Sequence, residues 1–417
     1  MKLKILSLIL IFACNVNIYG QIHLNCGIDT ATIEHKEILS FWNDYIKSKP
    51  SKNTTDYLEF WNENDKKLFK QPDLILHSIN TIHSTFAMGY PTLLSILPYQ
   101  KDFYEIKTAV GWADSTHIEL LAITNHYVKK VDEKYKLFMP FNVKTDINLI
   151  EQDNFRIYTL KNTEIPQDTL EKLSNFISQL KSDFGIAEKK KLTIIYGKNN
   201  KETEKILGYD FNLMSSSNNP SSGISDHSNN LIILNGLSSI FHETTHIYLM
   251  PLFPKSCLNE GIATYYGGSM GKSLAQGITF LNEYLTQNND INLYEKLKEN
   301  NFYINNEYNP IYTLQGLFVA IAGEKGGISE IQKILEYNDI DEMFAKYFKL
   351  KGSEKIDKFI KSELKNRTIK LVKMTQPVIS TNARHFDQRE KSRKNSRKIF
   401  CKQQQISRST LEMTETP

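Results

Sequence analysis

The chain has 417 residues, 40% of them apolar and 24% charged, and its formal net charge is +4. These values are ordinary for a globular protein with sizeable cores, and the length allows two or three domains. The four cysteines do not form the pattern of a disulfide scaffold. Beyond the first twenty residues no stretch approaches 18 consecutive apolar residues, so we expect no transmembrane span.

The first twenty residues have the pattern of a secretory signal peptide. Lys2 and Lys4 precede an apolar run that reaches small or polar residues by Gly20. We therefore expect a secreted or cell-envelope protein. Cys14 closes an imperfect bacterial lipoprotein box, so a lipid anchor at this residue is an alternative to plain cleavage after Gly20.

Residues 21–150 are expected to form an N-terminal α+β domain, whose role the sequence does not reveal. Residues 34–69 place apolar and aromatic side chains at helical spacing, which indicates core packing. A period of two follows in four segments, which predicts strands separated by turns: 92–97, 103–108, 117–128 and 135–139. Helices followed by an antiparallel sheet are typical of an α+β domain.

The next part of the chain alternates strands with helices. An amphipathic helix is predicted between Pro166 and Gly185, because one face stays apolar and glycine supplies the stop. Strands are predicted on both sides of it and before residue 240, and Asn, Ser, Gly and Pro predict a long loop at 210–230. The expected strands are 154–160, 192–196 and 231–234.

His242, Glu243 and His246 carry the clearest chemical signal. Two histidines four residues apart on a helix project from one face, about 5 to 6 Å apart at Cβ, so one divalent metal ion can bridge them. Glu243 lies at the edge of the same face, where a carboxylate can accept a proton from a metal-bound water. The sequence therefore predicts two metal ligands and a general base.

A third ligand is expected from the following segment. A hydrolytic zinc site takes three protein ligands and keeps one position open. Pro251 and Pro254 end the first helix, and a second helix beginning after Asn259 can bring Glu260 back to the metal. Cys257 is an alternative donor, although a buried and inert thiol is the expected role for it.

The two segments His242-Glu243-Thr244-Thr245-His246 and Leu258-Asn259-Glu260-Gly261-Ile262-Ala263 together resemble the gluzincin metallopeptidases, the thermolysin-like superfamily. The resemblance covers about residues 231–266, with a weaker match at 308–326. It implies a zinc peptidase in which His242, His246 and Glu260 bind one Zn²⁺ and Glu243 is the general base. It also implies a thermolysin-like catalytic domain, with a small mixed sheet followed by a helical lobe, over residues 151–370.

The resemblance also implies where a peptide or protein substrate would bind. An edge strand at 231–234 would pair with the substrate backbone, or else this strand is interior. His227 is a candidate substrate contact. Tyr312 is the first candidate, and Tyr308 the second, for a phenol that stabilises the oxyanion, with ordinary packing as the alternative. No Gly-x-Met-Glu-Asn sequence of the aminopeptidase branch is present.

Beyond residue 266 the periodicity is helical, and residues 371–417 then differ from the rest. After Gln376 there are 9 Lys and Arg against 4 Asp and Glu, so the basic balance belongs to this tail. It shows no folding pattern and is expected to be disordered. We expect no nucleic-acid partner. The four predicted helices are 274–285, 312–322, 328–335 and 356–364.

Two functions follow from these residues. The first is an exported zinc metallopeptidase in which the metal activates water and Glu243 takes the proton. The alternative is a secreted protein in which the same lobe holds zinc and binds peptides, or acts as a scaffold, without cleaving them.

Overall fold

The protein is described here from a computed structural model. It divides into two compact units, Met1–Thr368 and Ile369–Pro417, and the elements below lie in the first unit, except for the last turns of the final helix. The expected signal segment with Cys14, and residues 374–417 of the expected tail, lie outside the described residues. The described residues are 22–48, 50, 55–75, 86, 89–113, 117–187, 191–213, 222–305 and 308–373.

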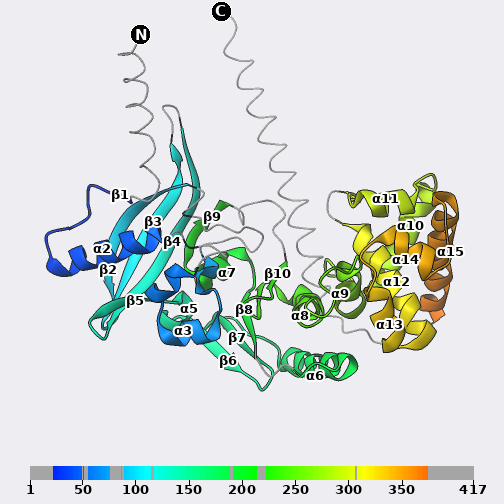
Figure 1. Ribbon diagram of the computed structural model, residues 1–417, viewed down its shortest axis with the longest axis horizontal. Coiled ribbons are helices and arrows are strands. Elements are labelled where there is room, and N and C mark those ends of the chain that lie inside the picture. The colour runs from blue at the N-terminus through cyan, green and yellow to red at the C-terminus, as the bar shows by residue number, and fades with distance from the viewer. Residues whose placement is uncertain are drawn as a thin grey trace, which may run out of the picture. The chain divides into compact units, whose positions relative to one another are not determined.

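A first sheet contains six strands, of which β2 to β5 are antiparallel neighbours (Figure 1). The β4–β5 turn is formed by Asp132 and Glu133, both at positive φ, as a two-residue hairpin between right-twisted strands requires. β1 adds in parallel to β2, and β9 pairs with β4. The strands are β1 (His23–Leu24), β2 (Tyr90–Tyr99), β3 (Phe103–Ala113), β4 (Ile118–Val131), β5 (Lys134–Phe138) and β9 (Tyr209–Asn212).

Helices from the first part of the chain cover this sheet. Trp42 and Tyr45 of α2 are fully buried in one hydrophobic cluster with sheet residues such as Ile106 and Val128. The aromatic stripe of residues 34–69 is therefore core, as its spacing predicts. The elements are α2 (Ile33–Lys47), η1 (Asp56–Phe60), α3 (Glu63–Leu68), η2 (Pro72–Ile75) and α5 (Pro140–Val143).

A second, mixed sheet has the strand order β10-β11-β8-β7-β6. β8 and β11 are parallel and apolar along their length, because both faces are covered. Side chains of β11 alternate between two cores, with Ile232 facing one and Ile233 the other. The strands are β6 (Ile147–Glu151), β7 (Phe155–Leu160), β8 (Leu192–Gly197), β10 (Gly223–Asp226) and β11 (Leu231–Asn235).

One sequence prediction needs correction here, and one open alternative is decided. The predicted loop at 210–230 contains part of β9 and all of β10, which pairs antiparallel with β11. The strand at 231–234 is therefore interior, and β10 is the edge strand. Alternating polar and apolar residues in so short a strand resemble loop composition, so local sequence does not reveal β10.

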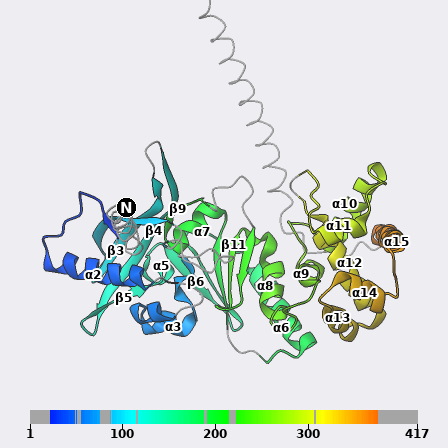
Figure 2. The same cartoon turned by 45° about the horizontal axis from the view of Figure 1, so that its top comes forward.

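Helices α6 and α8 pack on one face of the second sheet (Figure 2). Phe176 of α6 contacts Phe241 of α8 edge to face. Gly185, at φ 64°, ends α6 as its sequence predicts. The helices after α8 share the same hydrophobic cluster, whereas α7 packs in the cluster of the first sheet through Ile206 and Leu207. Their bounds are α6 (Gln167–Phe184), α7 (Asn200–Leu207), η4 (Leu237–Ser239), α8 (Ile240–Leu249), α9 (Asn259–Gly267), α10 (Leu274–Gln287), α11 (Leu293–Glu299), α12 (Pro310–Gly326), α13 (Ile328–Leu335), α14 (Ile340–Lys346) and α15 (Ser353–Lys373).

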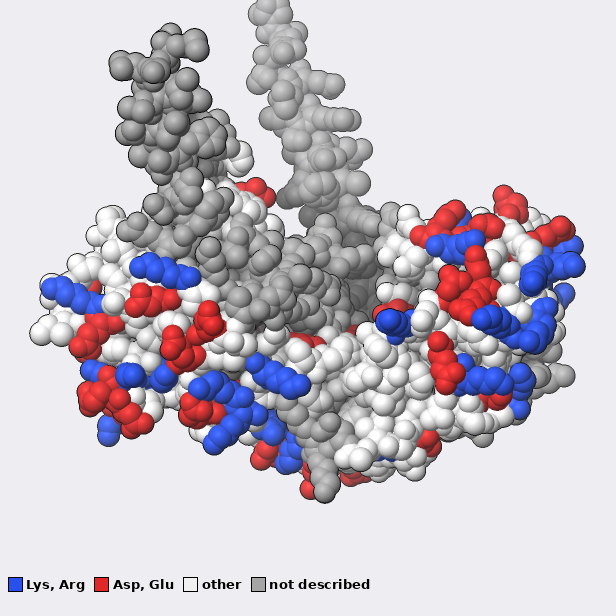
Figure 3. Space-filling model, viewed as in Figure 1, with Lys and Arg blue, Asp and Glu red and all other residues white. Residues whose placement is uncertain are grey.

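The fold is thus of the mixed α+β class, with two small mixed sheets and many helices. The expected boundary at residue 150 stays a prediction, and β9, from beyond it, belongs to the first sheet. No helix in the described ranges combines the length and apolar composition needed to cross a bilayer. On the face drawn in Figure 3, acidic and basic side chains of the described residues are interspersed.

Candidate metal centre

Helix α8 presents the two histidines. Almost all of its residues are buried. The hydroxyls of Thr244 and Thr245 donate hydrogen bonds to the carbonyls of Ile240 and Phe241, one turn earlier in the helix. The helix ends at Leu249, before the two prolines, as the sequence predicts. His242 and His246 therefore stand one turn apart on an unbroken helix.

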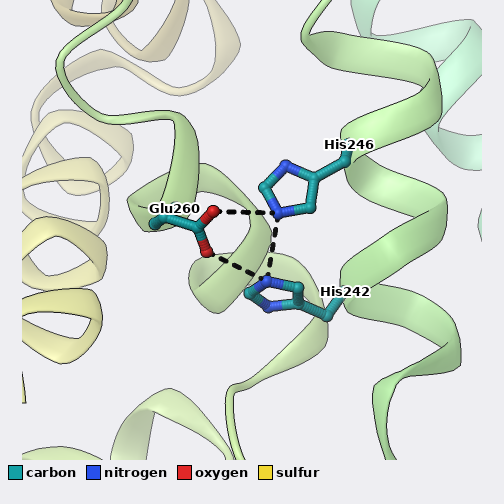
Figure 4. Close-up of side chains that lie close together, drawn as sticks. All are labelled: His242, His246 and Glu260. Carbon is teal, nitrogen blue, oxygen red and sulfur yellow. Dashed lines mark hydrogen bonds and ion pairs between the residues drawn. The ribbon is translucent and has the colours of Figure 1, made fainter. Parts of the chain in front are cut away.

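The side chains of His242, His246 and Glu260 converge (Figure 4). The two Nε2 atoms are 3.1 Å apart. Oε2 of Glu260 lies 3.3 Å from Nε2 of His242, and Oε1 lies 3.5 Å from Nε2 of His246. All three residues can direct one ligand atom at a common point, so this group could bind a metal ion.

Helix α9 delivers Glu260 because it packs closely on its neighbours. A Cβ on Gly261 would lie 2.6 Å from the main chain of Gln315 in α12, and one on Gly267 would lie 2.2 Å from the main-chain nitrogen of His242. Any larger side chain would push α9 away from α12 or α8. The glycines therefore fix the approach of the two helices that carry the group.

The ring of His242 is oriented by a main-chain partner. Its Nδ1 lies 2.6 Å from the carbonyl oxygen of Gly268, just after α9. A carbonyl only accepts, so Nδ1 donates its proton and Nε2 keeps a lone pair directed at the group. Burial opposes protonation of this ring, but Glu260 and Glu243 together raise its pKa. The same histidines lower the pKa of the Glu260 carboxyl despite its burial.

Glu243 points toward the edge strand. Burial raises its pKa, an effect that the nearby histidines and a hydrogen bond from Ser225 of β10 partly offset. A Cβ on Gly223 would lie 2.6 Å from Cγ of Glu243, so the main chain of β10 touches this side chain. Glu243 therefore lies beside the edge strand, within the field of the His242 and His246 pair, and is not part of the metal-binding group.

The two candidate tyrosines differ in their surroundings. The Tyr312 ring is 6.5 Å from that of His242 and nearly parallel to it. Burial and the charge of Glu260 raise the pKa of Tyr312 to about 12, so it is a neutral donor near the group. Tyr308 is buried, packs on Phe280 and hydrogen-bonds Thr313, which is typical of a core tyrosine.

His227 and Cys257 have other environments. His227 lies in the β10–β11 turn, where burial and His246 lower its pKa. Burial raises the pKa of the Cys257 thiol to about 12, and the cysteine is not in the metal-binding group. Among the described residues, Cys26 and Cys257 are free thiols.

Sequence reasoning missed the contributions of Gly223, Ser225 and the Gly268 carbonyl. The first two lie in a segment whose composition resembles a loop, and the third acts through its main chain. The close packing around Gly261 was also not predicted, although a glycine directly after Glu260 was a signal that could have indicated it. No protein-family model matches this sequence, and a search of the curated proteins also finds no match.

Proposed function

We propose that the protein is an exported zinc metallopeptidase with a thermolysin-like catalytic domain. The observation that carries the proposal is the convergence of His242, His246 and Glu260, with Glu243 on the same helix beside an edge strand. Zinc peptidases combine three such ligands with an adjacent carboxylate base. Residues 1–20 would export the chain.

The donor set fits zinc. A tetrahedral ion that binds nitrogen and oxygen at about 2.0 to 2.1 Å separates its ligand atoms by about 3.3 to 3.4 Å. The observed separations of 3.1, 3.3 and 3.5 Å lie around this value. Two imidazoles and one carboxylate also favour zinc over magnesium or calcium, which prefer oxygen ligands alone.

When bound, zinc would polarise the peptide carbonyl and lower the pKa of a water molecule toward about 7. Glu243 would take the proton from that water and pass it to the leaving amine. Burial suits this role, because a carboxylate with a raised pKa is a better proton carrier near neutral pH. The Ser225 hydroxyl would hold the Glu243 carboxylate toward β10.

The edge strand β10 would bind the substrate. β10 is the outermost strand of the second sheet and pairs with β11. The main-chain groups of a sheet edge can hold an extended peptide in register. Because β10 touches Glu243, such a peptide would be cut at a bond near the base. The resemblance implied this role for 231–234 if that strand lay at the edge of the sheet. Because β11 is interior, the proposal gives the role to 223–226.

Tyr312 would stabilise the transition state. Its phenol is neutral at physiological pH and can donate a hydrogen bond to an oxyanion. It comes from α12, which packs on α9 and so is held relative to Glu260.

A peptide-library digest tests the proposal. Purified protein should cleave peptides, chelation should abolish the cleavage, and added zinc should restore it. Glu243→Gln should keep one zinc per chain and lower the rate at least about 1,000-fold, because it removes only the base. Tight peptide binding without any cleavage, in protein that holds zinc, would favour the non-hydrolytic alternative. Equal rates for Glu243→Gln and wild type would refute the base assignment.

A further inference from the structure

The turn between β10 and β11, residues 227–230, is held from inside by Asp226. Its Oδ1 accepts hydrogen bonds from the main chain and hydroxyl of Ser228, at 3.0 and 2.5 Å. Its Oδ2 accepts one from Nδ2 of Asn229 at 2.9 Å. These hydrogen bonds fix the shape of the turn, so the end of β10 that joins the turn moves together with it.

The same Asn229 reaches a distant part of the chain. Its Oδ1 accepts a hydrogen bond from the main-chain nitrogen of Gln71 at 2.9 Å, and its Nδ2 donates to the main-chain oxygen of Gln71 at 3.0 Å. Asn229 is only 1% exposed. A buried amide that pairs with both main-chain groups of one residue is specific, because losing it leaves buried donors and acceptors unpaired.

Gln71 is itself fixed. It stands next to η2, whose Asp73 is fully buried and accepts hydrogen bonds from Tyr45 of α2 and from Trp61. Its position thus depends on the core of the first sheet, to which Tyr45 and Trp61 belong. The Asn229 amide connects this core to the edge strand.

The turn also contacts the metal helix. Pro251 has no N–H, so the carbonyl of Ile247 lacks its normal helical partner. The ring of His227 hydrogen-bonds the main chain of Ile247. The segment 227–230 therefore touches both α8, through His227, and the first-sheet region, through Asn229.

We infer that Asn229 is a positioning residue through which the N-terminal region, otherwise without a role, holds β10 against Glu243. The inference rests on the proposed function, because it assigns β10 to substrate binding. With the amide removed, the turn would keep its contact with α8 but lose both hydrogen bonds to the main chain of Gln71. β10 would stay paired with β11 but lose its main connection to the first-sheet region. Substrate backbone pairing would weaken, while the metal ligands on α8 and α9 would stay in place.

Three zinc-loaded full-length variants test this: Asn229→Ala, the isosteric Asn229→Asp, and Gln71→Ala as the control. Gln71→Ala keeps both main-chain groups and removes only the long hydrogen bond, 3.4 Å, that Oγ of Ser228 donates to Oε1 of Gln71. We expect amide hydrogen exchange in residues 222–226 to rise about tenfold in both Asn229 variants, as the loss of buried hydrogen bonds predicts. In both Asn229 variants, amide exchange in residues 38–46 of α2 and the zinc content should match wild type. The control variant should match wild type in every measurement. For a peptide that wild type cleaves, KM should rise about tenfold and kcat should stay within about twofold.

Three results would overturn the inference. Exchange in β10 could stay as in the control, it could rise equally in α2, or kcat could fall at unchanged KM, as a smaller folded fraction would cause. Asn229→Asp keeps the shape of the side chain and decides the question if Asn229→Ala does not fold. If wild type cleaves no peptide, the proposed function fails, and the exchange comparison alone still accepts or rejects the role of Asn229.

Discussion

The carboxylates of Asp73 and Glu260 have different kinds of partner. Asp73 is fully buried and is met by neutral donors, the Tyr45 hydroxyl and the Trp61 indole. The Glu260 side chain is 36% exposed and faces two imidazoles, which are themselves lone-pair donors. Burial raises the pKa of Asp73 to about 8, whereas the histidines lower that of Glu260.

The difference separates a structural carboxylate from a candidate metal ligand. Oδ1 of Asp73 accepts hydrogen bonds from two neutral core donors, which is typical of a structural carboxylate. Around Glu260, three groups that can each give a lone pair to a cation converge on one point, and one side stays accessible. Geometry of this kind is stable when a cation occupies the point, since lone pairs that face one another otherwise repel.

The largest expected effect that separates the two regions is that of Glu260→Ala. Removing one of three ligands should lower zinc affinity at least about 100-fold, because even changes beyond the ligands typically cost 10- to 100-fold. Competition with a chromogenic chelator measures this affinity.

Asp73→Ala is the counterpart. It leaves buried donors unpaired and should lower the free energy of unfolding by about 2 to 4 kcal/mol, with zinc affinity unchanged in the folded protein. The contrast between the regions would be wrong if Asp73→Ala released zinc from folded protein, or if Glu260→Ala left the affinity as it was.

A smaller effect is expected for Tyr312→Phe, which keeps the ring beside His242 and removes the hydroxyl. The variant should hold zinc normally and lower kcat about 10- to 100-fold, with KM little changed. Tyr308→Phe is the matched control and should leave kcat within about twofold, because its hydroxyl contacts Thr313 in the core. Equal losses in the two variants would assign both tyrosines to packing.

The last prediction concerns the pH dependence of stability. An unfolded Asp73 releases its proton near pH 4, whereas the folded residue keeps it to about pH 8. The folded state therefore binds more protons in this window, and Asp73 makes the free energy of unfolding fall as pH rises, by at most about 1.4 kcal/mol per pH unit. Asp73→Asn should remove this slope in urea unfolding between pH 5 and 8. Parallel curves for the two proteins would contradict the buried, protonated state.

Local signals in the sequence were sufficient for α8 and for the turn to α9. The spacing of His242 and His246 and the position of Pro251 act within a few residues, so they predict the helix, its end and the face on which both histidines lie. The class of the fold was likewise predictable, because periodicity separates the first sheet from the helices around it.

Other features depend on distant contacts. β10 becomes a strand because β11 offers it an edge, not because its residues favour strands, and its place beside Glu243 follows from that pairing. The ring of His242 is set by a main-chain carbonyl, and Asn229 by the main chain of Gln71. Main-chain partners leave no trace in side-chain identity, so sequence reasoning could not find them.

Elemental analysis of the purified full-length protein and of His242→Ala tests the central claim most directly. If His242, His246 and Glu260 hold one ion, wild type should contain one zinc per chain and His242→Ala close to none, while the control His23→Ala, an exposed histidine of β1, should match wild type. Wild type without zinc after growth and reconstitution with it, or His242→Ala with a full equivalent, would contradict the account.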